Sequence, residues 1–133
     1  MSPERHVLDT SALLTFIEDE PGAGIVEKLL RSGNSIIPWA ALLEIHYITN
    51  REKGPEEADR RFAILKQANA EIVWTMDEAT LLTAARFKAS HSLSFADAII
   101  AATAWRREGV LTHKDPEFEA LSGFIAMQTL PYK

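Results

Sequence analysis

The sequence predicts an α/β fold in which a mostly parallel five-stranded sheet is flanked by helices. Short runs of apolar and β-branched residues alternate along the chain with longer segments of helical spacing. This alternation is typical of a parallel sheet with helices on both faces. The chain has 133 residues, of which 47% are hydrophobic, and this is enough to build one core. We therefore expect residues 1–133 to form a single domain.

Strands are expected where short apolar or β-branched runs stand between turn residues. The five segments that meet this criterion are residues 6–8, 35–37, 71–75, 110–112 and 124–127. All five are short, and glycine or polar residues precede most of them. Short strands joined by helical segments favour parallel pairing, because a parallel connection needs a long crossover.

Helices are expected where apolar residues recur every three or four positions. These segments are residues 11–18, 23–31, 39–53, 56–68, 77–89, 94–108 and 115–121. The residues expected to cap or open helices are Ser11, Pro38, Asp77, Ser94 and Asp115-Pro116. Those expected to end them are Pro21-Gly22, Gly33-Asn34, Gly54-Pro55 and Gly109.

Composition narrows the function classes. The net charge of −5 lacks the general basic footprint of a nucleic-acid-binding protein and favours a basic protein partner. The chain has no cysteine, so it forms neither disulfides nor thiolate metal sites and suits a reducing cytoplasm. The polar start of the chain has no apolar signal-peptide core, and no apolar stretch is long enough to span a membrane. We expect a cytoplasmic protein with no membrane association.

Three acidic residues are predicted at one edge of the sheet. Asp9 ends the first strand, Asp115 follows the fourth, and Asp97 opens a largely apolar helix. Open α/β sheets bind ligands at the carboxyl ends of their strands. Each acid also has a structural explanation, since each stands where a helix-start carboxylate would cap free N–H groups. Those explanations remain open for each residue taken singly.

Glu44 is the fourth acid of interest, because it interrupts an apolar helix beside Leu42, Leu43 and Ile45. A carboxylate in such a helix is expected to be buried and needs a metal or an Arg or Lys partner. Crowded carboxylates persist only with a cation among them or with protons on some of them. A set of oxygen ligands favours Mg²⁺ or Mn²⁺. The joint pattern indicates metal-dependent phosphodiester chemistry.

The chain resembles the PIN-domain ribonucleases of the VapC type, which are toxins of toxin–antitoxin pairs. The segments that carry the resemblance are VLDTSAL (7–13), Glu44, LSFADAIIAATA (93–104) and LTHKDPEF (111–118). The resemblance implies a PIN-like fold and RNA cleavage with Mg²⁺ or Mn²⁺ held by Asp9 and Asp97. Glu44 and Asp115 would ligate the ion or hold its waters. The implied partners are RNA, a small antitoxin and a second copy of the chain.

The same resemblance assigns three supporting hydroxyl side chains near the acids, namely Thr10, Ser11 and Thr112. The family often has an aspartate where this chain has Glu117, and we expect Glu117 to be a solvated helix residue. His113 is expected at the surface rather than in catalysis. The tryptophans are expected in the core or in a subunit contact: Trp39, Trp74 and Trp105.

RNA phosphates require cations, which an acidic chain must supply locally. The candidates are Arg86, Lys88 and Lys114, with Arg106 and Arg107. A solvated or salt-bridged face explains these residues equally well.

Three other functions are conceivable for such a sheet. A haloacid-dehalogenase-like phosphatase needs a second aspartate at the place of Ser11, and a receiver domain needs a phosphorylatable aspartate after the third strand, where Asp77 is a poor match. A PIN-like module that only binds a protein remains the alternative, and it would lack a specific metal site.

Overall fold

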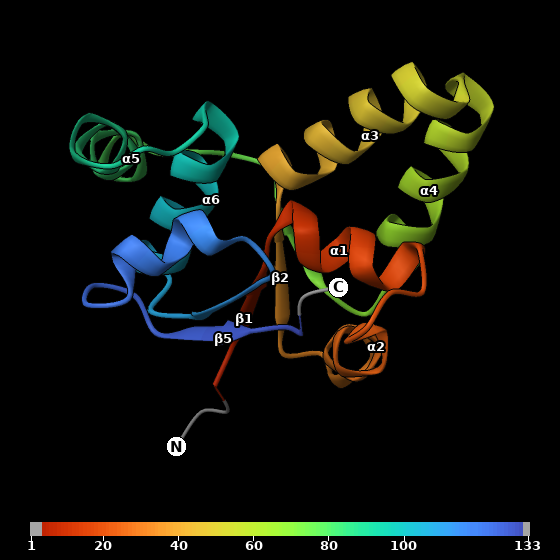
Figure 1. Ribbon diagram of the computed structural model, residues 1–133, viewed down its shortest axis with the longest axis horizontal. Coiled ribbons are helices and arrows are strands. Elements are labelled where there is room, and N and C mark those ends of the chain that lie inside the picture. The colour runs from red at the N-terminus through yellow and green to blue at the C-terminus, as the bar shows by residue number, and fades with distance from the viewer. Residues whose placement is uncertain (1–3, 132–133) are drawn as a thin grey trace.

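The computed structural model describes residues 4–131 and contains one five-stranded sheet (Figure 1). The strands are β1 (His6–Leu8), β2 (Ser35–Pro38), β3 (Glu71–Val73), β4 (Val110–His113) and β5 (Met127–Thr129). Their order in the sheet is β3-β2-β1-β4-β5, and every neighbouring pair is parallel. The prediction of a five-stranded, mostly parallel sheet is confirmed.

Helical segments connect the strands and cover the sheet on both sides. They are α1 (Thr10–Ile17), α2 (Ala23–Ser32), α3 (Trp39–Lys53), α4 (Pro55–Gln67), α5 (Glu78–Ser90), α6 (Phe95–Arg106) and the 3₁₀ helix η1 (Pro116–Leu121). Figure 1 shows α5 and α6 on one side of the strands and α1, α2 and α4 on the other. This arrangement follows from right-handed crossovers, because the chain moves outward through β1, β2 and β3 and then returns to β4.

The order in which strands are added reverses at β1, because β2 and β3 lie on one side of it and β4 and β5 on the other. Strands β1 and β4 are direct neighbours, with Leu8 opposite Thr112. In open α/β sheets the crevice for ligands opens at such a switch point, beyond the carboxyl ends of the strands. Asp9 follows β1 directly, and its backbone N–H donates to the Thr112 carbonyl at 3.2 Å. Asp115 lies two residues beyond β4. The topology therefore brings the residues after β1 and β4 together, as the sequence predicted.

Helix α6 is the most deeply buried helix, with every residue from Asp97 to Ala104 buried. It packs against β1, β4, α3 and α5. Its apolar length is held between these elements because removing apolar surface from water is the dominant favourable term in folding. The first turn of α6 is thereby fixed beside α3, and Figure 1 shows the start of α6 near the start of α3. Asp97 is placed by core packing rather than by a loop.

Three predicted boundaries were wrong, the first being the end of β3, which stops at Val73 rather than at residue 75. Helix α1 is capped by Asp9, whose side chain accepts the Ala12 N–H, whereas Ser11 lies inside the helix. The last strand begins at Met127 instead of residue 124. The reason is that the backbone N–H groups of Phe124 and Ile125 bond to the Leu121 carbonyl at 2.9 and 3.0 Å, which continues the turn after η1.

The three tryptophans do not all lie in the core, which was one of the two places expected for them. Trp39 packs half-buried against the core, but Trp74 and Trp105 are 55% and 45% exposed. Both stand at the ends of elements, Trp74 directly after β3 and Trp105 near the end of α6. Within residues 4–131, no helix has the length and apolar character needed to cross a membrane.

Candidate metal centre

Asp9 is fixed by its place at the start of α1. Its backbone is extended, and its Oδ1 accepts the Ala12 N–H at 2.7 Å. The Ser11 hydroxyl lies 2.8 Å from each carboxylate oxygen, to which it donates. Only 2% of Asp9 is exposed. The capping role considered from sequence is therefore real, and it orients the carboxylate at the carboxyl end of β1.

Burial raises the pKa of Asp9 to about 7, well above its ordinary value of 3.8. The hydrogen bonds from Ala12 and Ser11 oppose this rise, while the nearby charges of Asp97 and Asp115 add to it. The ionised form is costly because it is poorly solvated and stands beside like charges. A bound cation would remove that cost, since it turns repulsion among carboxylates into attraction.

Asp97 stands in the first turn of α6 and is 9% exposed. The Ser94 hydroxyl caps the helix by accepting the Asp97 N–H at 3.1 Å, so the carboxylate is not needed as the cap. Burial, together with the charges of Glu44, Asp115 and Glu117, raises the pKa of Asp97 to about 6. Asp97 thus lies within electrostatic reach of the other three acids.

Asp115, Asp97 and Glu117 form the tightest acidic group. Each offers a carboxylate oxygen that lies within 4.8 Å of the oxygens of the other two. Asp115 also caps η1, because its Oδ1 accepts the Glu117 N–H at 3.0 Å. Glu117 is exposed, as predicted, yet it belongs to this group rather than to an unrelated solvated face. The short 3₁₀ turn explains its position, since it folds residue 117 back beside residue 115.

Glu44 approaches the same acids from α3, but the prediction that it is buried was wrong. It is half-buried, and its neighbour Leu43 is 58% exposed because this face of α3 is open. The Thr10 hydroxyl donates to Glu44 Oε1 at 2.5 Å. The partner is therefore a neutral hydroxyl instead of the Arg or Lys of the ion-pair alternative. Its charge contributes to the raised pKa of Asp97.

Two of the three hydroxyl residues serve the acids through their side chains, as just described for Thr10 and Ser11. Thr112 behaves differently, because its hydroxyl lies 3.2 Å from His6 Nδ1 and 3.5 Å from Gln128 Oε1. The alternation of side chains along β4 points it to the face shared with these residues. Thr112 supports the site through its carbonyl, which accepts the Asp9 N–H.

Ser11→Ala tests whether this hydroxyl stabilises the site. Ser11 bonds both oxygens of Asp9 and accepts the Lys114 N–H at 2.9 Å. Its loss should lower the free energy of unfolding by about 1–3 kcal/mol, the cost of leaving buried polar groups unpaired. Denaturant unfolding at pH 7 measures this, with the exposed Ser92→Ala as control. Equal stability of both variants would contradict the assignment.

Most of the candidate RNA-binding cations form hydrogen bonds or ion pairs within the protein. Lys114 Nζ donates to the Pro21 carbonyl at 2.9 Å, lies 3.6 Å from Glu20, and has a side chain only 10% exposed. Lys88 Nζ donates to the Leu93 carbonyl at 2.9 Å, and Arg107 pairs with Glu71 at 3.1 Å. Arg86 and Arg106 are exposed. The geometry thus favours these two arginines over Lys114 as free cations.

The expectation for His113 was wrong, since the residue is fully buried. It is the last residue of β4, and it shares the buried face with Leu111 because side chains alternate along a strand. Its Nδ1 accepts the Asp115 N–H at 3.1 Å. Burial lowers the pKa of His113 and keeps the ring neutral. All four residues of β4 are buried, so His113 lies inside because both faces of this strand are covered, which the alternation of side chains alone does not indicate.

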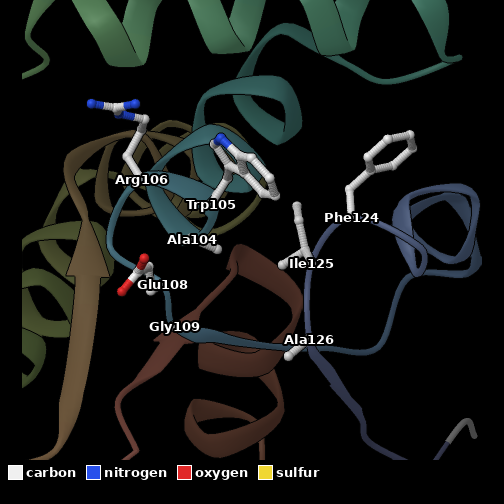
Figure 2. A pocket seen from close by; sticks show the side chains of 8 residues that line it. All are labelled: Ala104, Trp105, Arg106, Glu108, Gly109, Phe124, Ile125 and Ala126. Atoms are coloured by element: carbon white, nitrogen blue, oxygen red, sulfur yellow. The ribbon is translucent and has the colours of Figure 1, made fainter.

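A separate cavity of about 500 Å³ lies elsewhere on the protein (Figure 2). Its lining includes Gly109 and Ala126, which directly precede β4 and β5. Figure 2 shows the rings of Trp105 and Phe124 on either side of Ile125. The cavity therefore sits at the amino end of the sheet, whereas the acids gather at the carboxyl end. It plays no part in the candidate metal centre.

Comparison with known proteins agrees with this architecture. The chain is similar to the VapBC2 complex of Rickettsia felis bound to promoter DNA (16% identity, 95% of this chain and 98% of that chain, TM-score 0.76). It is also similar to DNA-bound VapBC of Salmonella typhimurium (18% identity, 96% and 98%, TM-score 0.76). A third similar structure is Mycobacterium tuberculosis VapC20, a sarcin–ricin loop cleaving toxin (18% identity, 90% and 96%, TM-score 0.68).

At these identities the solved structures establish the fold. A search of curated proteins found no match. The PIN domain family model matches residues 6–123, a span that contains all five acids of the candidate centre. The protein belongs to the PIN domain family.

Proposed function

We propose that the protein is a metal-dependent endoribonuclease and the toxin of a type II toxin–antitoxin pair. The observation that carries this proposal is the convergence of Asp97, Asp115 and Glu117, whose oxygens lie within 4.8 Å of one another. Membership of the PIN domain family and the fold similarity to a sarcin–ricin loop cleaving toxin support it.

The acids fit a hard divalent cation. The donor set consists of carboxylate oxygens, which suit Mg²⁺ or Mn²⁺. Burial is the main cause of the raised pKa values of Asp9 and Asp97, and neighbouring carboxylates add to it, while no basic side chain within residues 4–131 is among the groups that lower them. Such a cluster is stabilised by an added cation. When bound, Mg²⁺ or Mn²⁺ would lower the pKa of a bound water and offset charge on the attacked phosphate.

Each acid has a distinct part in this proposal. Asp9 and Asp97 are the direct ligands, because they are the most buried and are fixed by helix starts. Glu44 and Asp115 complete the ligand set or hold the waters, and Thr10 orients Glu44. Glu117 adds a fifth carboxylate on the solvent side of the site. Hydrogen bonds within the protein pre-organise the ligands before the substrate arrives.

The proposed partners follow from charge and exposure. RNA is the substrate, and the acidic site together with the net charge of −5 suits a basic antitoxin segment that covers it. The similar structures from Rickettsia felis and Salmonella typhimurium are VapBC complexes. Pairing of two copies is supported by exposed apolar side chains such as Phe95, which is 72% exposed. We place the protein in the cytoplasm, where its RNA substrate would be.

The test is cleavage of total cellular RNA by antitoxin-free protein with Mn²⁺, with Mg²⁺ or with chelator, followed by mapping of the new 5′ ends. We expect discrete products that require the metal. The Asp59→Asn variant controls for loss of an acidic side chain outside the site, because Asp59 is an exposed acid on α4 that pairs with His46. This control should cleave like the native protein.

Isothermal titration with Mn²⁺ distinguishes the nuclease from the alternative function, a PIN-like module that only binds a protein. Folded protein with neither cleavage products nor a specific Mn²⁺ site would overturn the nuclease proposal and leave the protein-interaction module. Folded protein that binds Mn²⁺ but leaves total RNA intact would restrict the substrate to an RNA absent from the sample, and supplying RNA from the native host would then decide the matter.

A further inference from the structure

His113 is held firmly at the carboxyl end of β4. It is fully buried, and its ring packs edge-on against Phe118 with 5.2 Å between the ring centroids. Its carbonyl accepts the Leu130 N–H at 2.8 Å, which ties it to the end of β5. The position of the ring is thus set by packing and by the sheet. Because the ring is fixed, the positions of its two nitrogen atoms, Nδ1 and Nε2, are fixed as well.

Two side chains, those of Ser11 and His113, accept hydrogen bonds from the backbone turn that leads to Asp115. The Lys114 N–H donates to the Ser11 hydroxyl at 2.9 Å, and the next N–H, that of Asp115, donates to His113 Nδ1 at 3.1 Å. The same Ser11 hydroxyl donates to Asp9. A continuous set of hydrogen bonds therefore links Asp9, the turn and Asp115. The turn has little freedom to move Asp115 relative to Asp9.

The direction of the bond determines the form of the ring. Because Nδ1 accepts an N–H, it carries a lone pair, and the proton of the neutral ring must be on Nε2. His113 Nε2 has no hydrogen-bond partner within residues 4–131, and Glu119 Oε1 lies 3.8 Å from it. Thr129 holds this glutamate oxygen with a hydrogen bond of 3.0 Å. One nitrogen of the ring thus serves the turn of Asp115, and the other faces Glu119.

We propose that His113 is a positioning residue for the metal centre, acting through Asp115 by accepting its backbone N–H with the Nε2–H tautomer. The inference rests on the proposed metal site. His113 would not bind the ion itself; it supplies an acceptor at a fixed place for the backbone N–H of Asp115. Loss of an outer partner of this kind typically weakens metal affinity or activity by about 10–100-fold.

Three variants distinguish positioning from simple packing. In His113→Asn the amide oxygen replaces Nδ1 as acceptor, in His113→Gln the amide reaches the place of Nε2, and in His113→Leu the volume is kept without any acceptor. Mn²⁺ affinity, measured by isothermal titration, should be close to native in the Asn variant and weaker by about 10–100-fold in the other two. A role in packing alone predicts the reverse order, with leucine tolerated best in a buried place.

The control and a second measurement keep the outcomes separate. His6→Asn, at the opposite end of β1, should leave Mn²⁺ affinity unchanged. Long-range ¹H–¹⁵N correlation spectra of the native protein should show the Nε2–H tautomer of His113, a result that does not depend on the folding of any variant. The Nδ1–H tautomer, or native Mn²⁺ affinity in His113→Leu, would overturn the inference and leave the proposed nuclease intact. Absence of Mn²⁺ binding in the native protein would overturn both.

Discussion

Asp97→Asn is expected to abolish metal-dependent RNA cleavage while the fold persists. Asp97 is buried in the first turn of α6 and lies among the charges of Glu44, Asp115 and Glu117. Asparagine keeps the size but removes the charge that would hold a divalent cation. Since partners outside the ligand shell already contribute about 10–100-fold, loss of a ligand should lower kcat/KM by more than about 100-fold.

The fold should survive this change because Ser94 caps α6. Removing a carboxylate with a raised pKa also relieves repulsion in the metal-free protein. The measurements are cleavage of a defined RNA, Mn²⁺ titration and thermal unfolding. Asp77→Asn is the matched control, since it changes another helix-start aspartate, the exposed N-cap of α5. Native activity with normal metal dependence in Asp97→Asn would exclude Asp97 as a ligand.

Asp9→Asn is expected to make the metal-free protein more stable than the native chain at pH 8 and about equally stable near pH 4. The folded state raises the pKa of Asp9 from 3.8 to about 7. Each pKa unit corresponds to about 1.4 kcal/mol, so ionising the folded protein at this residue costs about 4 kcal/mol at most. Asparagine keeps an oxygen that can accept the Ala12 N–H and avoids this cost.

The sign follows from proton binding. Between pH 3.8 and about 7, the folded state holds a proton at Asp9 that the unfolded state has released. The unfolded state then binds fewer protons, and the free energy of unfolding falls as the pH rises through this window. Below it both states are protonated, and above it both are ionised, so the loss is complete above about pH 7. The Asn variant lacks this contribution, and its advantage therefore grows from pH 4 to pH 7.

Denaturant unfolding at pH 4, 5, 6, 7 and 8, with chelator and then with Mn²⁺, checks this expectation. Mn²⁺ should raise the stability of the native protein, because an ion that binds only the folded state stabilises it. The same ion should have little effect on Asp9→Asn. Asp59→Asn, at an exposed acid on α4, should follow the native pH dependence. A native protein whose stability is the same at pH 5 and pH 8 would contradict the prediction.

The sequence by itself determined the architecture and the position of most of the acids at one edge of the sheet. Alternation of short apolar runs with helical segments predicted the sheet, because parallel strands need crossovers. The places of Asp9 after β1 and of Asp97 in an apolar helix put both at the carboxyl edge. These inferences succeeded because they depend on local periodicity and on the parallel order of the strands.

Only the tertiary structure decided how the acids meet and what holds them. Glu117 lies with Asp97 and Asp115 because a 3₁₀ turn folds it back, and no local pattern fixes that turn's direction. The half-exposure of Glu44 and the burial of His113 depend on which elements pack over them. Periodicity tells which face of an element is apolar, whereas contacts between elements far apart in the chain decide how much of that face is covered.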